Sequence, residues 1–176
     1  MTATAENLSP NESRTSHSLG ELLAMDTTKL ADLYRGATSP RIADLSGDLR
    51  GRMLAVCGLG APLSDLVRHA AASDRFPWRG KSFTPLSEDR GEGRNRVLSD
   101  RWKLFRFETF VGPSRAGAFD AVHLDYDHAS NPFFIRAIKD EIRELEPGLY
   151  LGQAYVQIGA EPKLVLYFGL ASASLE

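Results

Sequence analysis

Apolar and polar residues alternate along most of the chain, and a period of two is typical of β-strands with one buried face. Short runs of Gly, Pro, Asp and Glu separate the alternating stretches and are typical of turns. The connections are mostly short, so neighbouring strands are expected to run antiparallel. A sheet of this length tends to close, because closure removes its edges. The predicted strands are residues 47–56, 78–86, 91–98, 102–111, 118–126, 149–158 and 163–170.

Helical spacing of apolar residues occurs in the other segments. Leucines recur at this spacing over residues 19–34, and Asp26 offers a cap in the middle, which predicts a leader of two short helices. Residues 62–72 predict a further short helix that begins with a proline. Residues 131–145 predict a longer helix, capped by Asn131. The last two helices are expected to cover the barrel.

These elements predict a mainly β (α+β) fold: one antiparallel barrel of about seven or more strands with a helical N-terminal leader and two covering helices. Residues 1–18 are rich in Ser, Thr, Asn and Glu and are interpreted as a flexible arm. Residues 19–174 are interpreted as a single domain, since 176 residues with 43% hydrophobic content can build one core.

Composition narrows the classes of partner. The net charge is −2, which gives no general reason to expect a nucleic-acid partner, and no apolar run is long enough to span a membrane. The N-terminus shows no secretory signal, and the single cysteine, Cys57, fits a reducing cytoplasm, where we expect the protein to reside. Residues 50–106 carry 12 Lys and Arg against 6 Asp and Glu. This basic stretch is either ordinary solvated surface or a rim that attracts an anionic ligand.

Two short motifs carry a family resemblance. The first predicted strand begins with Gly47-Asp48-Leu49-Arg50-Gly51, and the second contains Pro77-Trp78-Arg79-Gly80-Lys81-Ser82-Phe83. Together they resemble the calycin superfamily, which includes lipocalins and fatty-acid-binding proteins, and more narrowly the small bacterial GXWXG-type domains. Leu49 stands where that family has Trp. The resemblance implies a calycin-like barrel with an interior pocket for a small apolar molecule.

Candidate acid/base residues cluster on one predicted strand. His123, Asp125 and Asp127 share one face of it, and Tyr126 lies on the other, apolar face. The polar face is either in water or lines a cavity, where Asp125 beside His123 would suit a general base. No metal site is expected, because the spacing of a facial triad needs a second histidine farther downstream than His128.

The strand before it offers a second set of polar residues. Arg106 and Glu108 are either an outer ion pair or interior groups, in which case Arg106 would hold a ligand carboxylate and Glu108 would join the acid/base set. Aromatic residues on several strands could surround an apolar guest. For Tyr155 the outward orientation is favoured by its neighbours. The candidate ligand-binding residues are Arg106, Trp78, Phe105, Phe107, Tyr126, Tyr155 and Tyr167.

We therefore expect the barrel to bind a small, largely apolar organic molecule that is lipid-like or polyketide-like. In one version of this hypothesis the molecule also carries an acidic group. The alternative is a cofactor-independent enzyme of cyclase or isomerase type, with His123, Asp125 and Glu108 as catalytic residues. A plain interaction module is a third alternative. No phosphate loop or dinucleotide fingerprint occurs, and no cofactor is expected. Whether the chain forms a homodimer stays open.

Overall fold

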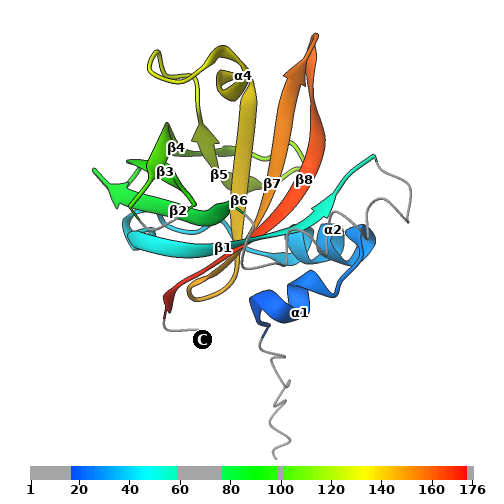
Figure 1. Cartoon of the computed structure of the whole chain (residues 1–176). Helices are drawn as coiled ribbons and strands as arrows, with labels where there is room; N and C mark the ends of the chain where they lie inside the picture. The colour runs from blue at the N-terminus through cyan, green and yellow to red at the C-terminus, as the bar shows by residue number, and fades with distance from the viewer. Residues whose placement is uncertain (1–16, 59–76, 99–100, 174–176) are drawn as a thin grey trace, which may run out of the picture.

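The alternation of inward and outward side chains builds a closed barrel. In the computed structural model, which describes residues 17–58, 77–98 and 101–173, eight antiparallel strands follow one another around the barrel. Each of these strands pairs with the next, and the last pairs with the first (Figure 1). The predicted fold class, mainly β with a closed antiparallel sheet and covering helices, is confirmed. The strands are β1 Gly47–Val56, β2 Trp78–Pro85, β3 Arg90–Val97, β4 Lys103–Pro113, β5 Asp120–Asp125, β6 Ile138–Glu146, β7 Leu149–Ile158 and β8 Glu161–Ala171.

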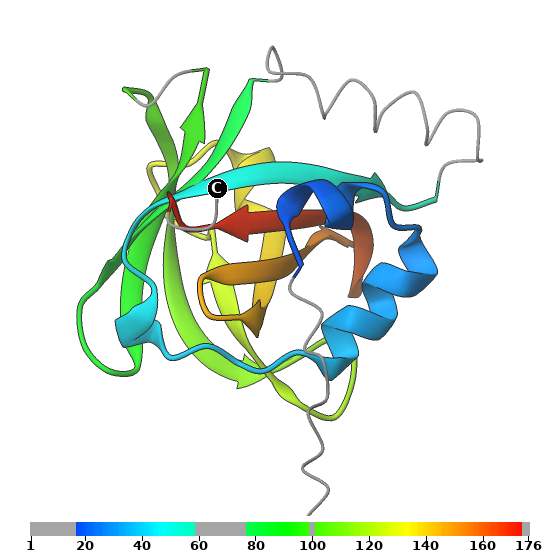
Figure 2. The same cartoon turned by 90° about the horizontal axis from the view of Figure 1, so that it is seen from below.

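The N-terminal leader contains two short helices, as predicted. They are α1 (Leu19–Leu23) and α2 (Thr27–Gly36), and a short 3-10 turn, η1 (Ile42–Asp44), follows them. The Asp26 side chain accepts a hydrogen bond from the backbone N–H of Lys29 at 2.9 Å, so the second helix begins where the sequence offers its cap. α1 packs against β1 and β8, and α2 packs against β6 and β7, so the leader covers one side of the barrel (Figure 2).

Two predictions fall wholly or largely outside the described residues. The predicted helix at residues 62–72 is one of them, and most of the predicted arm at residues 1–18 is the other. The last residues of the arm are described: the backbone N–H of His17 donates to Glu146 Oε1 at 2.6 Å, and Ser18 caps α1. The domain boundary therefore stays a prediction.

The helix predicted over residues 131–145 is wrong. A single helical turn, α4 (Phe133–Arg136), is followed directly by strand β6. β6 pairs with β5 on one side and β7 on the other, with Ile142 opposite both Val122 and Gly152. Residues spaced by four satisfy a helical stripe and a strand face equally, since four is also a multiple of two. Pairing on both edges overrides the helical preference of the charged residues between them.

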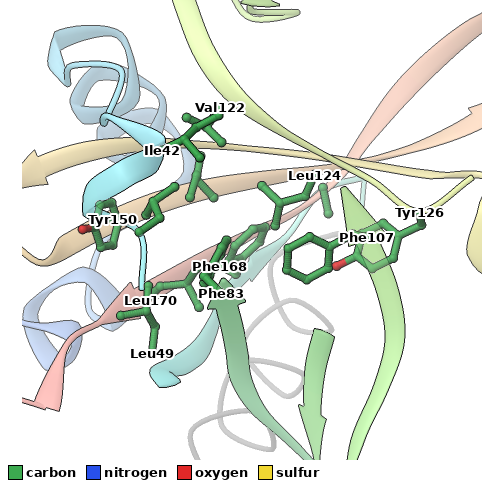
Figure 3. Close-up of a cluster of buried hydrophobic side chains, with 13 residues drawn as sticks. Ile42, Leu49, Phe83, Phe107, Val122, Leu124, Tyr126, Tyr150, Phe168 and Leu170 are labelled. Atoms are coloured by element: carbon green, nitrogen blue, oxygen red, sulfur yellow. The ribbon is translucent and has the colours of Figure 1, made fainter. Parts of the chain in front are cut away.

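Apolar side chains fill the barrel interior. Figure 3 shows part of this cluster, in which the rings of Phe83 and Phe107 lie 5.4 Å apart and those of Phe107 and Tyr126 lie 5.3 Å apart. Ile42 and Leu45, in and just after η1, join the same cluster from the end of the barrel where β1 begins. A second apolar cluster lies outside the barrel wall, where Leu22, Leu30 and Tyr34 of the leader pack against β1, β7 and β8.

The two ends of the barrel differ. One end carries the β2–β3, β4–β5 and β6–β7 turns, together with η1. At the opposite end β1, β3, β5 and β7 finish and β2, β4, β6 and β8 begin, and α4 lies there (Figure 1). Packed side chains fill the first end, whereas the residues described next surround a cavity toward the second.

Candidate functional site

A charged and hydrogen-bonded cluster lies inside the apolar barrel. Its centre is Lys81 on β2, which is only 3% exposed. The Lys81 ammonium nitrogen donates to Asn95 Oδ1 at 2.9 Å, to the Tyr126 hydroxyl at 2.5 Å and to Asp140 Oδ2 at 2.9 Å. These partners come from β3, from the residue after β5 and from β6, so the cluster joins opposite parts of the wall. All three N–H groups of the ammonium have acceptors.

The partners of Lys81 are also bonded to one another. Asn95 Nδ2 donates to the Tyr126 hydroxyl at 3.0 Å, and that hydroxyl donates to Asp140 Oδ2 at 3.1 Å. The indole N–H of Trp78 donates to Asn95 Oδ1 at 3.0 Å. One oxygen of the cluster is unpaired: Asp140 Oδ1 is buried and has no hydrogen-bond partner among the described residues. Buried polar atoms of that kind are uncommon in folded proteins and call for an explanation.

Four aromatic rings surround the Lys81 ammonium. Its nitrogen lies 5.0 to 5.5 Å from the ring centres of Trp78, Phe107, Tyr126 and Phe168. Rings at this distance attract a cation through their negative faces, and together with Asp140 they offset part of the cost of burying the charge. Burial lowers the pKa of the Lys81 amine, and Asp140 opposes that shift by favouring the charged form. Burial, helped by Asp140, also raises the pKa of the Tyr126 hydroxyl well above its usual range, so this group keeps its proton.

A cavity of about 290 Å³ borders the cluster. Trp78, Lys81, Asn95, Tyr126 and Asp140 reach it, so the buried charges form its polar part. The remaining walls are apolar, and include Met53, Val97, Phe105, Ile138, Leu166 and Phe168. Ile135 of α4 also lines it, so the cavity extends toward the end of the barrel where that helical turn lies.

Glycines on neighbouring strands make room for the rings in these walls. A Cβ atom at Gly51 would lie 2.5 Å from the Trp78 ring, and one at Gly152 would lie 2.2 Å from the Phe168 ring. Both distances are far below van der Waals contact, so any other residue would displace the ring beside it. Small residues opposite large ones are how a narrow barrel accommodates aromatic side chains.

Four of the predicted site residues lie at this site. Trp78, Phe105 and Tyr126 line the cavity, and Phe107 is fully buried with its ring 5.4 Å from the Lys81 nitrogen. Tyr126 belongs here because Val122 and Leu124, on the same face of the chain, point into the barrel. The alternation of the sequence was sufficient to predict that orientation.

The predicted acid/base set lies elsewhere. His123, Asp125 and Glu108 are on the outer face of the wall, since the residues that alternate with them fill the interior. Asp125 pairs with Lys139 at 2.6 Å, and Glu108 is exposed. His123 is buried on the outer face of the wall, where its ring stacks on Phe110. Its ring nitrogens lie 3.0 Å from an Arg115 nitrogen and 3.1 Å from the Pro113 carbonyl oxygen. None of these three side chains reaches the cavity.

The other three predicted ligand-binding residues also face outward. Arg106 is paired with Glu92 at 2.5 Å and lies 3.4 Å from His128. Tyr155 donates to Gln153 Oε1 at 2.7 Å, and Gln153 donates to the Tyr167 hydroxyl at 3.1 Å. For Arg106 this arrangement is the outer ion-pair alternative, although its partner is Glu92 rather than Glu108.

The cluster contains three residues that were not among the predicted site residues: Lys81, Asn95 and Asp140. Lys81 had a usable signal, because it lies two residues before Phe83 and so shares its inward face. Asp140 had none, since the helix predicted there put it on the solvent side. Its position follows only from the pairing of β6 between β5 and β7.

A second buried carboxylate lies on the outside of the same strand. Glu141 Oε1 accepts from the Tyr34 hydroxyl at 3.0 Å and from the Ser114 hydroxyl at 2.6 Å. Its Oε2 accepts from the backbone N–H and from a guanidinium nitrogen of Arg115, both at 3.1 Å. Both oxygens are therefore occupied, and the group ties α2 and the β4–β5 loop to the barrel wall.

The fold and this site define a closed antiparallel β-barrel with a mixed apolar and charged cavity inside it. No protein-family model matches the chain, and no curated protein matches it either. Among solved structures, a protein from Thermomonospora curvata is similar, with a TM-score of 0.50 and 17% sequence identity, over 87% of this chain and 94% of that chain. The structural similarity supports the barrel fold. At 17% sequence identity it gives no information about the function of this chain.

The described residues lack two kinds of feature. No helix in them is both long and apolar enough to span a membrane. They also contain no group of three or more His, Cys, Asp or Glu side chains arranged to hold a metal ion.

Proposed function

We propose that the protein binds one small, predominantly apolar organic molecule in the cavity, with the polar end of that molecule at Asp140. The observation that carries this proposal is the position of the Lys81–Asp140 pair. It borders a cavity of about 290 Å³ whose other walls are almost entirely apolar. An apolar pocket with a few convergent polar groups is the usual form of a small-molecule site.

The cost of burying charges supports a role beyond folding. The two side chains of the pair are 3% and 5% exposed. A buried ion pair is often no more stabilising than apolar residues of similar size, because both charges must leave water. A barrel core could be filled without it, as it is around Phe83 and Leu124. A buried pair beside a cavity is therefore better explained by what enters the cavity.

The volume limits the size of the guest. An engineered cavity of about 150 Å³ holds benzene, so a cavity about twice as large suits a bicyclic or short-chain molecule. Among lipid-like or polyketide-like molecules, this volume limits the expected ligand to small ones.

A closed barrel with an inner pocket is also what the calycin resemblance implies. Membership of the calycin superfamily is part of the proposal, and so is a cytoplasmic location.

Calorimetric titration with 2-naphthol, a neutral bicyclic phenol, tests the proposal. Saturable binding at a stoichiometry near one is expected for the wild-type protein. Val97→Trp should weaken it by tenfold or more, because Val97 lines the cavity and a larger ring would fill it. Val111→Trp is the matched control, since Val111 is 45% exposed near the end of β4 and does not line the cavity.

The folding of each variant is checked by thermal melting. Leu166→Phe, which adds less volume to the same apolar lining, replaces Val97→Trp if that variant does not fold. Absence of saturable binding, or equal binding by the cavity and surface variants, would overturn the proposal.

The alternative is a cofactor-independent enzyme of cyclase or isomerase type. One observation favours it: a general base needs a lone pair within reach of its substrate. Asp140 lines the cavity, and its carboxylate oxygen Oδ1 has no partner among the described residues. The base would then be Asp140 rather than His123, Asp125 or Glu108. NMR spectroscopy of ligands recovered after incubation separates the two functions, because an isomerised product has the mass of its substrate but a different spectrum, whereas a binding protein returns the ligand unchanged.

A further inference from the structure

Most hydrogen-bond donors and acceptors of the buried cluster are already paired. Those that remain unpaired determine which guest can bind. The three N–H groups of Lys81 donate hydrogen bonds to Asn95, Tyr126 and Asp140. The Tyr126 hydroxyl accepts two hydrogen bonds and donates its only hydrogen to Asp140 Oδ2. The acceptor that remains is Asp140 Oδ1, on a side chain that is 5% exposed and that lines the cavity.

We propose that the guest donates a hydrogen bond from a neutral hydroxyl group to Asp140 Oδ1, so that the cavity selects alcohols and phenols over carboxylates. This inference rests on the proposed binding function and adds the chemical class of the ligand. A hydroxyl donor satisfies a buried acceptor that the described protein leaves unpaired, and unpaired buried acceptors are costly.

The charge balance of the cluster argues against an anionic guest. Lys81 and Asp140 form a pair with no net charge, at 2.9 Å. A carboxylate in the cavity would leave one uncompensated negative charge away from water, and every N–H of Lys81 is already bound. Asn95 Nδ2 has a second hydrogen that a guest oxygen could accept, but a carboxylate there would face the negative charge of Asp140.

A cationic guest is disfavoured for the opposite reason. An ammonium group could also donate to Asp140 Oδ1, but it would lie close to the positive charge of Lys81 within the same apolar enclosure. A neutral hydroxyl avoids both penalties. The basic stretch at residues 50–106 does not alter this conclusion, because Lys81, the one cation that lines the cavity among the described residues of this stretch, is already paired.

Three naphthalenes that differ only in their polar group test the proposal in the wild-type protein near pH 7. They are 2-naphthol, which donates, 2-methoxynaphthalene, which can only accept, and 2-naphthoate, which is anionic. Calorimetric titration should give 2-naphthol at least a tenfold lower Kd than either of the others. Equal affinities, or tightest binding of 2-naphthoate, would overturn the hydroxyl assignment while leaving the pocket in place. If none of the three binds, the proposed binding function itself fails.

Two variants connect the preference to Asp140. In Asp140→Asn the preference for 2-naphthol over 2-naphthoate should fall by tenfold or more, because Lys81 then lacks its anionic partner and favours an anionic guest. The double variant Lys81→Met/Asp140→Leu removes both charges and serves if the single variant does not fold. It should bind 2-naphthol and 2-methoxynaphthalene within about threefold of each other. An unchanged preference in either folded variant would mean that Asp140 does not select the guest.

Discussion

Asp140 and Glu141 are neighbours on β6, and both are buried carboxylates, yet they face opposite sides of the barrel wall. Asp140 points into the barrel toward Lys81, and Glu141 points outward beneath α2 and the β4–β5 loop. Taken as whole residues, backbone included, both are at most 4% exposed. The strand alternation that separates them therefore produces two carboxylates of equal burial in different chemical settings.

The two settings differ in how completely the oxygens are bonded. Both oxygens of Glu141 accept hydrogen bonds, from Tyr34, Ser114 and Arg115. Asp140 accepts through Oδ2 alone, and its Oδ1 has no partner among the described residues. Only Asp140 borders the cavity. A saturated buried carboxylate is typical of a structural tie, whereas one with a spare acceptor beside a cavity can bind a guest.

The first and largest expected effect tests the inner pair. Lys81→Met should destabilise the protein by about 3–5 kcal/mol, because it leaves Asp140 buried without its counter-charge. Urea denaturation at neutral pH measures this loss. Arg106→Met is the control, since the Arg106 side chain is 35% exposed in its pair with Glu92 and its loss should cost below about 1 kcal/mol. Equal costs for the two substitutions would contradict the distinction between inner and outer pairs.

The second effect tests the outer tie. Glu141→Ala should cost about 2–4 kcal/mol in the same assay, because it strips acceptors from the buried Tyr34 hydroxyl and from Arg115. It should leave the binding of 2-naphthol nearly unchanged. A variant that remains as stable as wild type but loses binding would mean that the outer cluster, rather than the inner one, belongs to the site.

The third effect separates structure from function most directly. Lys81→Met/Asp140→Leu replaces the inner pair by apolar side chains. Removing both charges together should be nearly neutral, so the loss should stay near the value of about 1–2 kcal/mol expected for the Tyr126 hydroxyl, which loses its acceptor. The matched outer variant, Arg115→Met/Glu141→Leu, should be destabilised more, because two hydroxyls, those of Tyr34 and Ser114, lose their acceptor. If the inner double variant proved as unstable as the outer one, the inner pair would be a structural element.

The smallest effect concerns an exposed carboxylate on the outer face. Burial tends to raise the pKa of Asp125, but hydrogen bonds from Lys139 and the Asp127 backbone outweigh it and hold the pKa below its usual value. A depressed pKa stabilises the folded state above the unfolded value of about 3.9, and this contribution is lost as the pH falls below it. Because Asp125 is 37% exposed, the loss should stay below about 1 kcal/mol.

Comparing wild type with Lys139→Met between pH 5 and about pH 2 isolates that contribution. The difference in stability between the two proteins should shrink as the pH falls. A difference that stays constant over this range would mean that Asp125 titrates alike in the folded and unfolded chains.

The strands and the leader could largely be predicted because their signals are local. The alternation around Val122 and Leu124 and the cap at Asp26 each depend on a few neighbouring residues, and the structure confirms them. The inward position of Trp78, Phe105 and Tyr126 was likewise available from alternation and composition. For His123 and Asp125 the sequence left two alternatives, a face in water or a cavity lining, and the structure places both residues on the outer face, because alternation reveals that they share a face but not which chemistry that face carries.

The sequence by itself determined a period-two barrel and which residues share a face. Tertiary structure alone decided that residues 138–146 are a strand, because that choice depends on pairing with β5 and β7, far away along the chain. The same choice turns Asp140 inward to meet Lys81, 59 residues before it. A site assembled from β2, β3, β6 and the end of β5 has no local signature, since hydrogen bonding around the closed barrel brings these residues together.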